Sequence, residues 1–178
     1  MFKNDLVMVA GEDSELAAKY ADQSFTLDDL ATGDYTVAVG DASVPAGNYT
    51  NQALSTVGCF IDADGKTGKD SAGTDGSYDG TPLEGKVNLQ SSVGNVCKQA
   101  QSGAVDVAFV YSSDVYRFGG VKVIGVVPDD THKNIIYPAA SARTPRRPRL
   151  QTSSSSGLPP TPMPRSFGRS GASSWFLD

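Results

Sequence analysis

Three junctions between an apolar, strand-like segment and a helix-like segment could bind an anion. They are residues 40–47 (GDASVPAG), 92–96 (SVGNV) and 110–114 (VYSSD). The first turn of a helix presents backbone N–H groups that have no intrahelical partner, together with the positive end of the helix dipole. Two such helix starts and one tyrosine hydroxyl could hold a negatively charged ligand without any cationic side chain.

Catalytic chemistry has few candidates in this chain. A nucleophile–base pair would have to use His132, the only histidine, which lies in the polar run PDDTHKN and is expected in a surface turn. Cys59 and Cys97 have no CxxC spacing and no neighbouring histidine. We expect them to be small buried hydrophobic residues, and a disulfide between them stays open. The sequence therefore predicts no enzyme, no His-rich metal site and no cofactor.

The charge of the chain changes sign near residue 141. Residues 1–141 contain nine Lys/Arg and nineteen Asp/Glu, a net charge of -10, whereas residues 142–178 contain six Arg and one Asp, a net charge of +5. An acidic body is unsuited to the phosphate backbone of nucleic acid, so we expect no nucleic-acid partner. The segment 142–178 is rich in Arg, Pro and Ser and is predicted to be disordered. It is either a basic tail or an out-of-frame translation of a C-terminal helix.

The junctions must be positioned by the elements around them. Apolar runs bounded by Gly, Asp or Pro predict strands at 5–10, 35–39, 86–89, 105–111, 121–127 and 135–137. Helical patterns predict a capped turn at 26–30 and helices at 46–57 and 93–101. Strands that alternate with helices indicate an α/β fold, a mainly parallel sheet flanked by helices. In such a sheet the ligand binds beyond the carboxyl ends of the strands.

Residues 62–85 are rich in Gly and Asp and are predicted to be an inserted, solvated loop. Two motifs there are incomplete. A phosphate-binding loop that ends in DGKT would need a glycine where Phe60 stands. A calcium loop that begins at Asp62 and Asp64 would need an Asp or Asn at Lys66 and a Glu at Gly73. A polar loop is favoured, and weak calcium binding is the lesser alternative.

Three separated segments resemble the periplasmic molybdate-binding proteins of ATP-binding-cassette importers. They are VAVGDASVPAGNYTNQAL, GNVCKQAQSGAVDVAFVYSSDV and VKVIGVVPDDTHKNIIYPAA, in the family's order. The resemblance covers roughly residues 2–141 and implies one lobe of a type II periplasmic-binding-protein fold. It also implies that the backbone amides of Ala46 and Val96 and the hydroxyl of Tyr111 bind molybdate or tungstate, with no protein ligand on the molybdenum itself.

The same resemblance implies a monomeric receptor in the periplasm whose partner is a membrane permease. The chain departs from the family in several ways. The N-terminal lobe with its two serine-containing ligand loops is not found, residues 1–13 do not form a signal peptide, and the tail 142–178 replaces a C-terminal helix. Two alternatives follow: a non-functional, truncated receptor fragment, or an effector-sensing module of a transcription regulator, although no DNA-binding segment precedes Met1.

Overall fold

The computed structural model describes residues 4–135. The predicted tail 142–178 and most of the predicted strand 135–137 lie outside the described residues. Over residues 4–135, no helix has the length and apolar content that a membrane crossing requires.

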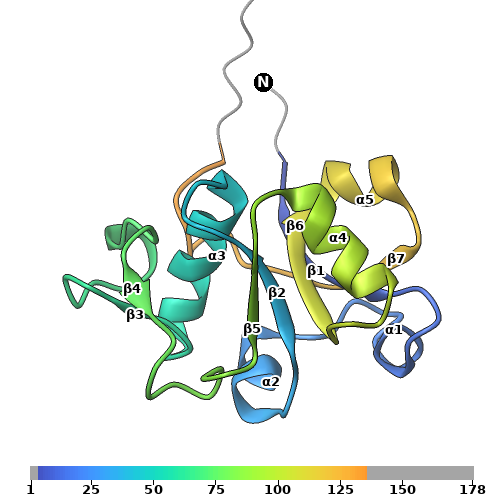
Figure 1. Cartoon of the computed structure of the whole chain (residues 1–178), viewed down its shortest axis with the longest axis horizontal. Coiled ribbons are helices and arrows are strands. Elements are labelled where there is room, and N and C mark those ends of the chain that lie inside the picture. Colours follow the sequence, from blue (N-terminus) through green and yellow to red (C-terminus); the bar gives the residue numbers. More distant parts are fainter. Residues whose placement is uncertain (1–3, 136–178) are drawn as a thin grey trace, which may run out of the picture. The chain divides into compact units, whose positions relative to one another are not determined.

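A five-stranded sheet forms the centre of the described chain (Figure 1). Its strands, in spatial order, are β5 (Val87–Gln90), β2 (Val37–Gly40), β6 (Val107–Tyr111), β1 (Leu6–Gly11) and β7 (Val121–Val126). β2 is parallel to both β5 and β6, whereas β1 is antiparallel to both β6 and β7. Four of the five strands therefore point the same way, as the predicted α/β class requires.

Helices cover both faces of this sheet. The elements outside the sheet are α1 (Glu15–Lys19), α2 (Leu27–Thr32), α3 (Pro45–Thr56), β3 (Ile61–Asp62), the 3-10 turn η1 (Gly68–Asp70), β4 (Gly76–Ser77), α4 (Val93–Gln101) and α5 (Ser112–Phe118). α4 has the bounds that the sequence predicts, and α2 begins with the predicted capping box between Thr26 and Asp29. The short helices α1 and α5 were not predicted, because five and seven residues are too few to show a helical period.

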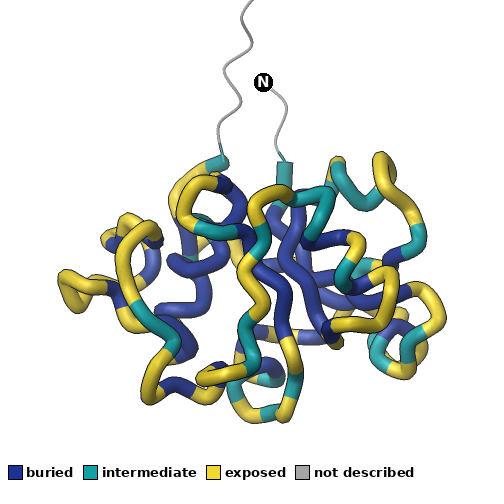
Figure 2. The backbone as a smooth tube through the Cα atoms, viewed as in Figure 1, coloured by how far each residue is buried: buried dark blue, intermediate teal, exposed yellow. Residues whose placement is uncertain are grey.

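Alternate residues of the strands pack into two separate cores. One core joins Leu6, Met8 and Phe109 to α3, and the other joins Val7, Val9 and Val110 to α4. The strands in the middle of the molecule are buried on both faces, as the dark blue tube in Figure 2 shows. α3 and α4 therefore lie on opposite faces of one sheet.

This arrangement excludes a disulfide between Cys59 and Cys97. Cys59 belongs to the core under α3 and Cys97 to the core under α4, so the intact sheet separates them. Both are free thiols, and burial raises the pKa of each to about 11. The prediction of two small buried hydrophobic residues is confirmed.

Most residues of the segment 62–85 are exposed, as the prediction of a solvated loop expects, but part of the segment is fixed against α3. α3 buries a row of polar side chains on this side: Asn51 donates to the Gly73 carbonyl at 2.8 Å and Gln52 donates to the Ala72 carbonyl at 3.2 Å. The Ser55 hydroxyl accepts from the Gly68 amide at 2.8 Å. Leu83 adds a fully buried apolar contact. The glycines and polar residues of this segment therefore supply backbone partners for a polar helix face.

Asp62 organises this segment from inside it. Its carboxylate accepts from the Ser71 hydroxyl and from the Asp64 amide, and these hydrogen bonds hold the pKa of the carboxyl below its usual range. The Asp62 carboxylate that the calcium hypothesis requires is thus bonded to protein donors, and the Asp64 carboxylate lies 3.2 Å from the Lys66 ammonium. In residues 4–135, no three His, Cys, Asp or Glu side chains gather as a metal site would need.

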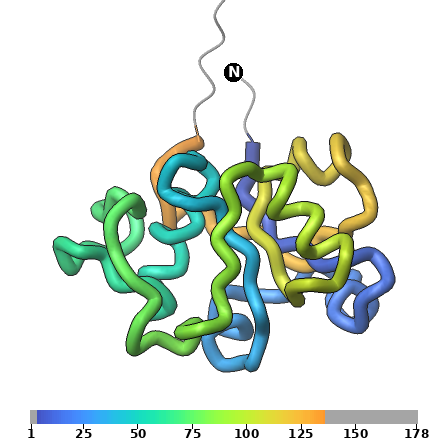
Figure 3. The backbone as a smooth tube through the Cα atoms, viewed as in Figure 1, coloured from blue at the N-terminus to red at the C-terminus, as the bar shows by residue number. Residues whose placement is uncertain are grey.

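The segment 128–135 crosses α3 beside the 62–85 segment, and it is the orange tube in Figure 3. His132 is only 2% exposed and its ring centroid lies 5.9 Å from that of Tyr49. The next residue, Lys133, donates its amide to Gln52 at 2.9 Å and its ammonium to the Ser71 carbonyl at 3.1 Å. The expectation of a surface turn is therefore wrong for His132, because tertiary contacts bury it.

The first turn of α3 lies in close contact with the end of β2. A β-carbon on Gly47 would lie 2.0 Å from the Gly40 oxygen and 2.9 Å from the Asp41 oxygen. A β-carbon on Gly40 would in turn lie 2.9 Å from that of Val44. Glycine at both positions allows the first turn of the helix to pack this closely against the end of the strand.

We predict that Gly47→Ala lowers the free energy of unfolding by about 1–3 kcal/mol, because the new methyl group meets rigid backbone atoms. Urea denaturation of the whole chain measures this difference. Gly94→Ala is the matched control. Its methyl group would lie 3.2 Å from the movable end of the Phe118 ring, and alanine favours a helix, so stability should hold or rise. A Gly47→Ala protein as stable as wild type would show that the contact imposes no constraint.

Candidate functional site

The carboxyl ends of three adjacent strands meet at one edge of the sheet. Gly40, the last residue of β2, is paired with Gln90, the last residue of β5, and Ala38 is paired with Ala108 of β6. Because β2 lies between β5 and β6, the three junctions predicted from the sequence follow three neighbouring strand ends. The start of β1 lies at the same edge, where Leu6 pairs with Tyr111.

The first junction places Ala46 in the first turn of α3. Val44 is the N-cap and Pro45 is the first helical residue, which has no N–H group. Ala46 therefore carries the first amide of the helix, at a position without an intrahelical acceptor. The preceding turn is held by the Asp41 carboxylate, which accepts from the Ser43 amide at 2.9 Å.

At the second junction, the amides that could bind a ligand lie at the very start of α4, before Val96. Ser92 is the N-cap, and its hydroxyl accepts from the Asn95 amide at 3.3 Å. The amide of Val96 donates to the Ser92 carbonyl at 3.1 Å, so it is already used inside the helix. The amides that precede it, those of Val93 and Gly94, are the ones for which a helix offers no acceptor. A serine followed three residues later by Asn95 is the sequence signal that could have fixed this register.

The third junction places Tyr111 at the end of β6. Its side chain is 8% exposed and belongs mainly to the core under α3, and the residue is also the N-cap of α5. The Asp114 carboxylate accepts a hydrogen bond from the Tyr111 backbone amide. Burial raises the pKa of Asp114 above its ordinary value, and this backbone hydrogen bond opposes the shift. Tyr111 is thus held from both the strand and the helix.

The three junctions contain no Lys, Arg or His. An anion at this edge would therefore be bound by neutral donors, namely the first amides of α3 and α4 and the Tyr111 hydroxyl. The predicted residues Ala46, Val96 and Tyr111 all belong to elements that begin or end at this edge, with Val96 one turn inside α4.

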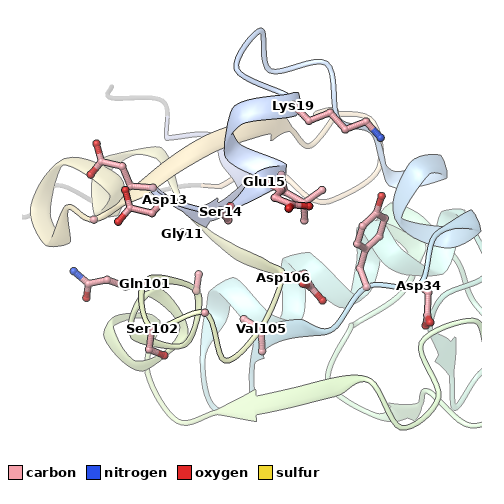
Figure 4. A pocket seen from close by; sticks show the side chains of 16 residues that line it. Gly11, Asp13, Ser14, Glu15, Lys19, Asp34, Gln101, Ser102, Val105 and Asp106 are labelled. Carbon is pink, nitrogen blue, oxygen red and sulfur yellow. The ribbon is translucent and has the colours of Figure 1, made fainter.

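A hollow of the described chain lies at the opposite edge of the sheet (Figure 4). It measures about 890 Å³ and lies among the start of α1, the end of α4 and the segments that lead into β2 and β6. Its charged side chains are Glu12, Asp13, Glu15, Lys19, Asp34 and Asp106. We call it the acidic hollow. Five carboxylates against one ammonium would repel an anion, so this hollow is not a candidate for the predicted site.

Comparisons with known proteins agree with the architecture. Residues 1–152 match the family model described as bacterial extracellular solute-binding protein. The molybdate-binding protein ModA of Escherichia coli K12 is 28% identical over 138 residues, which are 77% of this chain and 46% of that protein.

Solved structures give similar matches. The substrate-binding domain of a putative molybdenum ABC transporter from Clostridium difficile has 32% identity and a TM-score of 0.48, over 73% of this chain and 45% of that one. The periplasmic molybdate-binding protein of Azotobacter vinelandii has 18% identity and a TM-score of 0.49, over 75% and 48% of the two chains. The chain thus spans less than half the length of these relatives, and it belongs to the family of bacterial extracellular solute-binding proteins.

Proposed function

We propose that this chain forms an oxyanion-binding lobe of a molybdate or tungstate receptor that serves an ATP-binding-cassette importer. The observation that carries the proposal is the convergence of two helix starts and Tyr111 on the adjacent carboxyl ends of β5, β2 and β6. The relatives in E. coli and A. vinelandii are named for molybdate binding, and they support this choice of anion. The receptor would act in the periplasm as a monomer, without catalysis or a cofactor.

The binding groups we assign are the Ala46 amide, the Val93 amide and the Tyr111 hydroxyl. Val93 replaces Val96 in this assignment, because the Val96 amide is bonded to Ser92. These groups would donate hydrogen bonds to oxygens of the tetrahedral dianion, and the helix dipoles of α3 and α4 would add a favourable field. The molybdenum would touch no protein atom.

The lobe would provide only part of the shell that a tetrahedral dianion needs. The matched relatives are about twice as long as the region this chain covers, so the rest of the shell is expected from a second lobe. Closure of two lobes around the ion would exclude water and create the surface that a membrane permease recognises. An acidic body does not oppose such binding, because the local amides and dipoles act at short range.

Val93→Pro tests which amide of α4 binds. Proline removes the N–H group but suits the first position of a helix, and Ser92 before it is extended, with φ -158 and ψ 150. We expect molybdate binding, followed by NMR titration, to weaken about tenfold through loss of one charge-assisted hydrogen bond. Val93→Ala is the control, since it loses the same apolar side chain and keeps the amide. Equal affinities of the two variants would refute the assignment of Val93.

A second prediction concerns the affinity of the whole site. By calorimetry, the 178-residue chain should bind molybdate weakly or undetectably, because several donors and the closing lobe are not supplied. Joining the chain to the part of the E. coli relative that it does not cover should restore tight binding. Tyr111→Phe should then reduce the affinity about tenfold or more, because one donor to a dianion is lost.

Two outcomes would contradict that prediction. Tight binding of molybdate by the 178-residue chain alone would refute the proposal that this lobe provides only part of the donors around the ion. Tight binding of sulfate, with none of molybdate, by the joined protein would refute the choice of anion.

A further inference from the structure

Asn4, the residue two positions before β1, makes three hydrogen bonds to the start of α5. Its Nδ2 donates to the Ser113 hydroxyl at 2.8 Å, and its Oδ1 accepts from the Ser112 hydroxyl at 2.8 Å and from the Ser113 amide at 3.2 Å. More than one hundred residues of chain separate the partners. We call this set of contacts the Asn4 clamp.

The Asn4 clamp supplies an N-terminal cap that the N-cap side chain of α5 does not provide. The N-cap position of α5 is Tyr111, whose side chain makes no capping hydrogen bond. Tyrosine cannot cap, because its hydroxyl lies at the far end of a rigid ring, whereas asparagine is among the preferred capping residues. The Asn4 Oδ1 accepts from the amide of the second helical residue, Ser113, and so caps the helix from another part of the chain.

The backbone reinforces the same connection. The Ser112 amide donates to the Asp5 carbonyl at 2.9 Å, and the Asp5 amide donates to the Ser112 hydroxyl at 3.3 Å. One residue further on, Leu6 pairs with Tyr111 in the sheet. Tyr111 therefore pairs with Leu6 in the sheet, and the two residues after it are bonded to Asn4 and Asp5. These contacts join the start of β1 to the end of β6.

We infer that Asn4 is a positioning residue for Tyr111, and that it tunes oxyanion affinity without touching the anion. The inference rests on the proposed function, since it assumes that the Tyr111 hydroxyl contacts the ligand. Without the clamp the first turn of α5 would fray, and the end of β6 would lose the support that limits the motion of Tyr111. Binding of the anion would then also have to order that turn, and this cost would lower the affinity.

The test uses the 178-residue chain and sodium molybdate, with two NMR readouts: amide exchange in α5, and the shift of the Tyr111 signals during titration. We expect Asn4→Ala to speed exchange of the Ser113 and Asp114 amides about fivefold and to raise the apparent Kd for molybdate by a similar factor. Asn4→Asp keeps the acceptor atoms and should restore slow exchange. Asn88→Ala removes an exposed asparagine on β5 and should change neither readout.

Ser113→Ala separates positioning from direct contact. It frees the Asn4 Nδ2 from the Ser113 hydroxyl and keeps the capping bond to the Ser113 amide, so positioning predicts a small effect on both readouts. An Asn4→Ala protein with weaker binding and unchanged exchange would make Asn4 a direct ligand and overturn the inference. Faster exchange with an unchanged Kd would reduce the clamp to a structural role and leave the proposed function standing. If the Tyr111 signals of the wild-type chain do not change when molybdate is added, both the inference about Asn4 and the proposed function are wrong.

Discussion

Gly47 approaches the Gly40 carbonyl so closely that no β-carbon fits between them, and the candidate site follows from this contact. This contact holds the first turn of α3 against the end of β2, the central of the three converging strands, with only residues 41–44 between the two elements. Pro45 then makes Ala46 the first N–H group of the helix. With β5 and β6 on either side, α4 and Tyr111 reach the same edge. Two glycines thus determine where an amide lies, although neither needs to touch a ligand.

Carboxylates lie at both edges of the sheet, but the candidate edge has only Asp41 and Asp114 in its junctions, whereas five line the acidic hollow. The acidic hollow gathers Glu12, Asp13 and Glu15 with two further carboxylates, of which Asp34 is paired with Lys86 at 2.8 Å and Asp106 accepts from the Thr36 amide at 2.8 Å. The opposite edge presents helix starts whose amides are neutral. A chain with an acidic body can therefore offer an anion a favourable place, because the field of a helix start acts within the first turn and distant charges are screened.

The sequence predicts those parts of the fold that have a clear period and clear boundaries. The buried strands are apolar runs, two of which end at a glycine, and α4 begins after a serine cap and is followed by Gly103, so these elements are found from local signals. The order of segment 62–85 and the burial of His132 were not predicted, because they depend on polar partners supplied by α3. The sequence assigned the Val96 amide to the candidate site, but this amide is bonded to Ser92, because the position of the cap at Ser92 decides which amides a helix leaves without an acceptor. The cap of α5 could not be predicted, since Asn4 reaches it across the chain.

The proposed site binds an oxyanion at one edge of the sheet through backbone amides. The most direct test is an amide-resolved NMR titration of the 178-residue chain with sodium molybdate, with sodium chloride at equal ionic strength as the control. We expect the amides of Ala46, Val93 and Gly94 and the signals of Tyr111 to shift together along one saturating curve, while the signals of the amides in the acidic hollow do not shift. Shifts confined to the acidic hollow, or no response that exceeds the chloride control, would contradict this proposal.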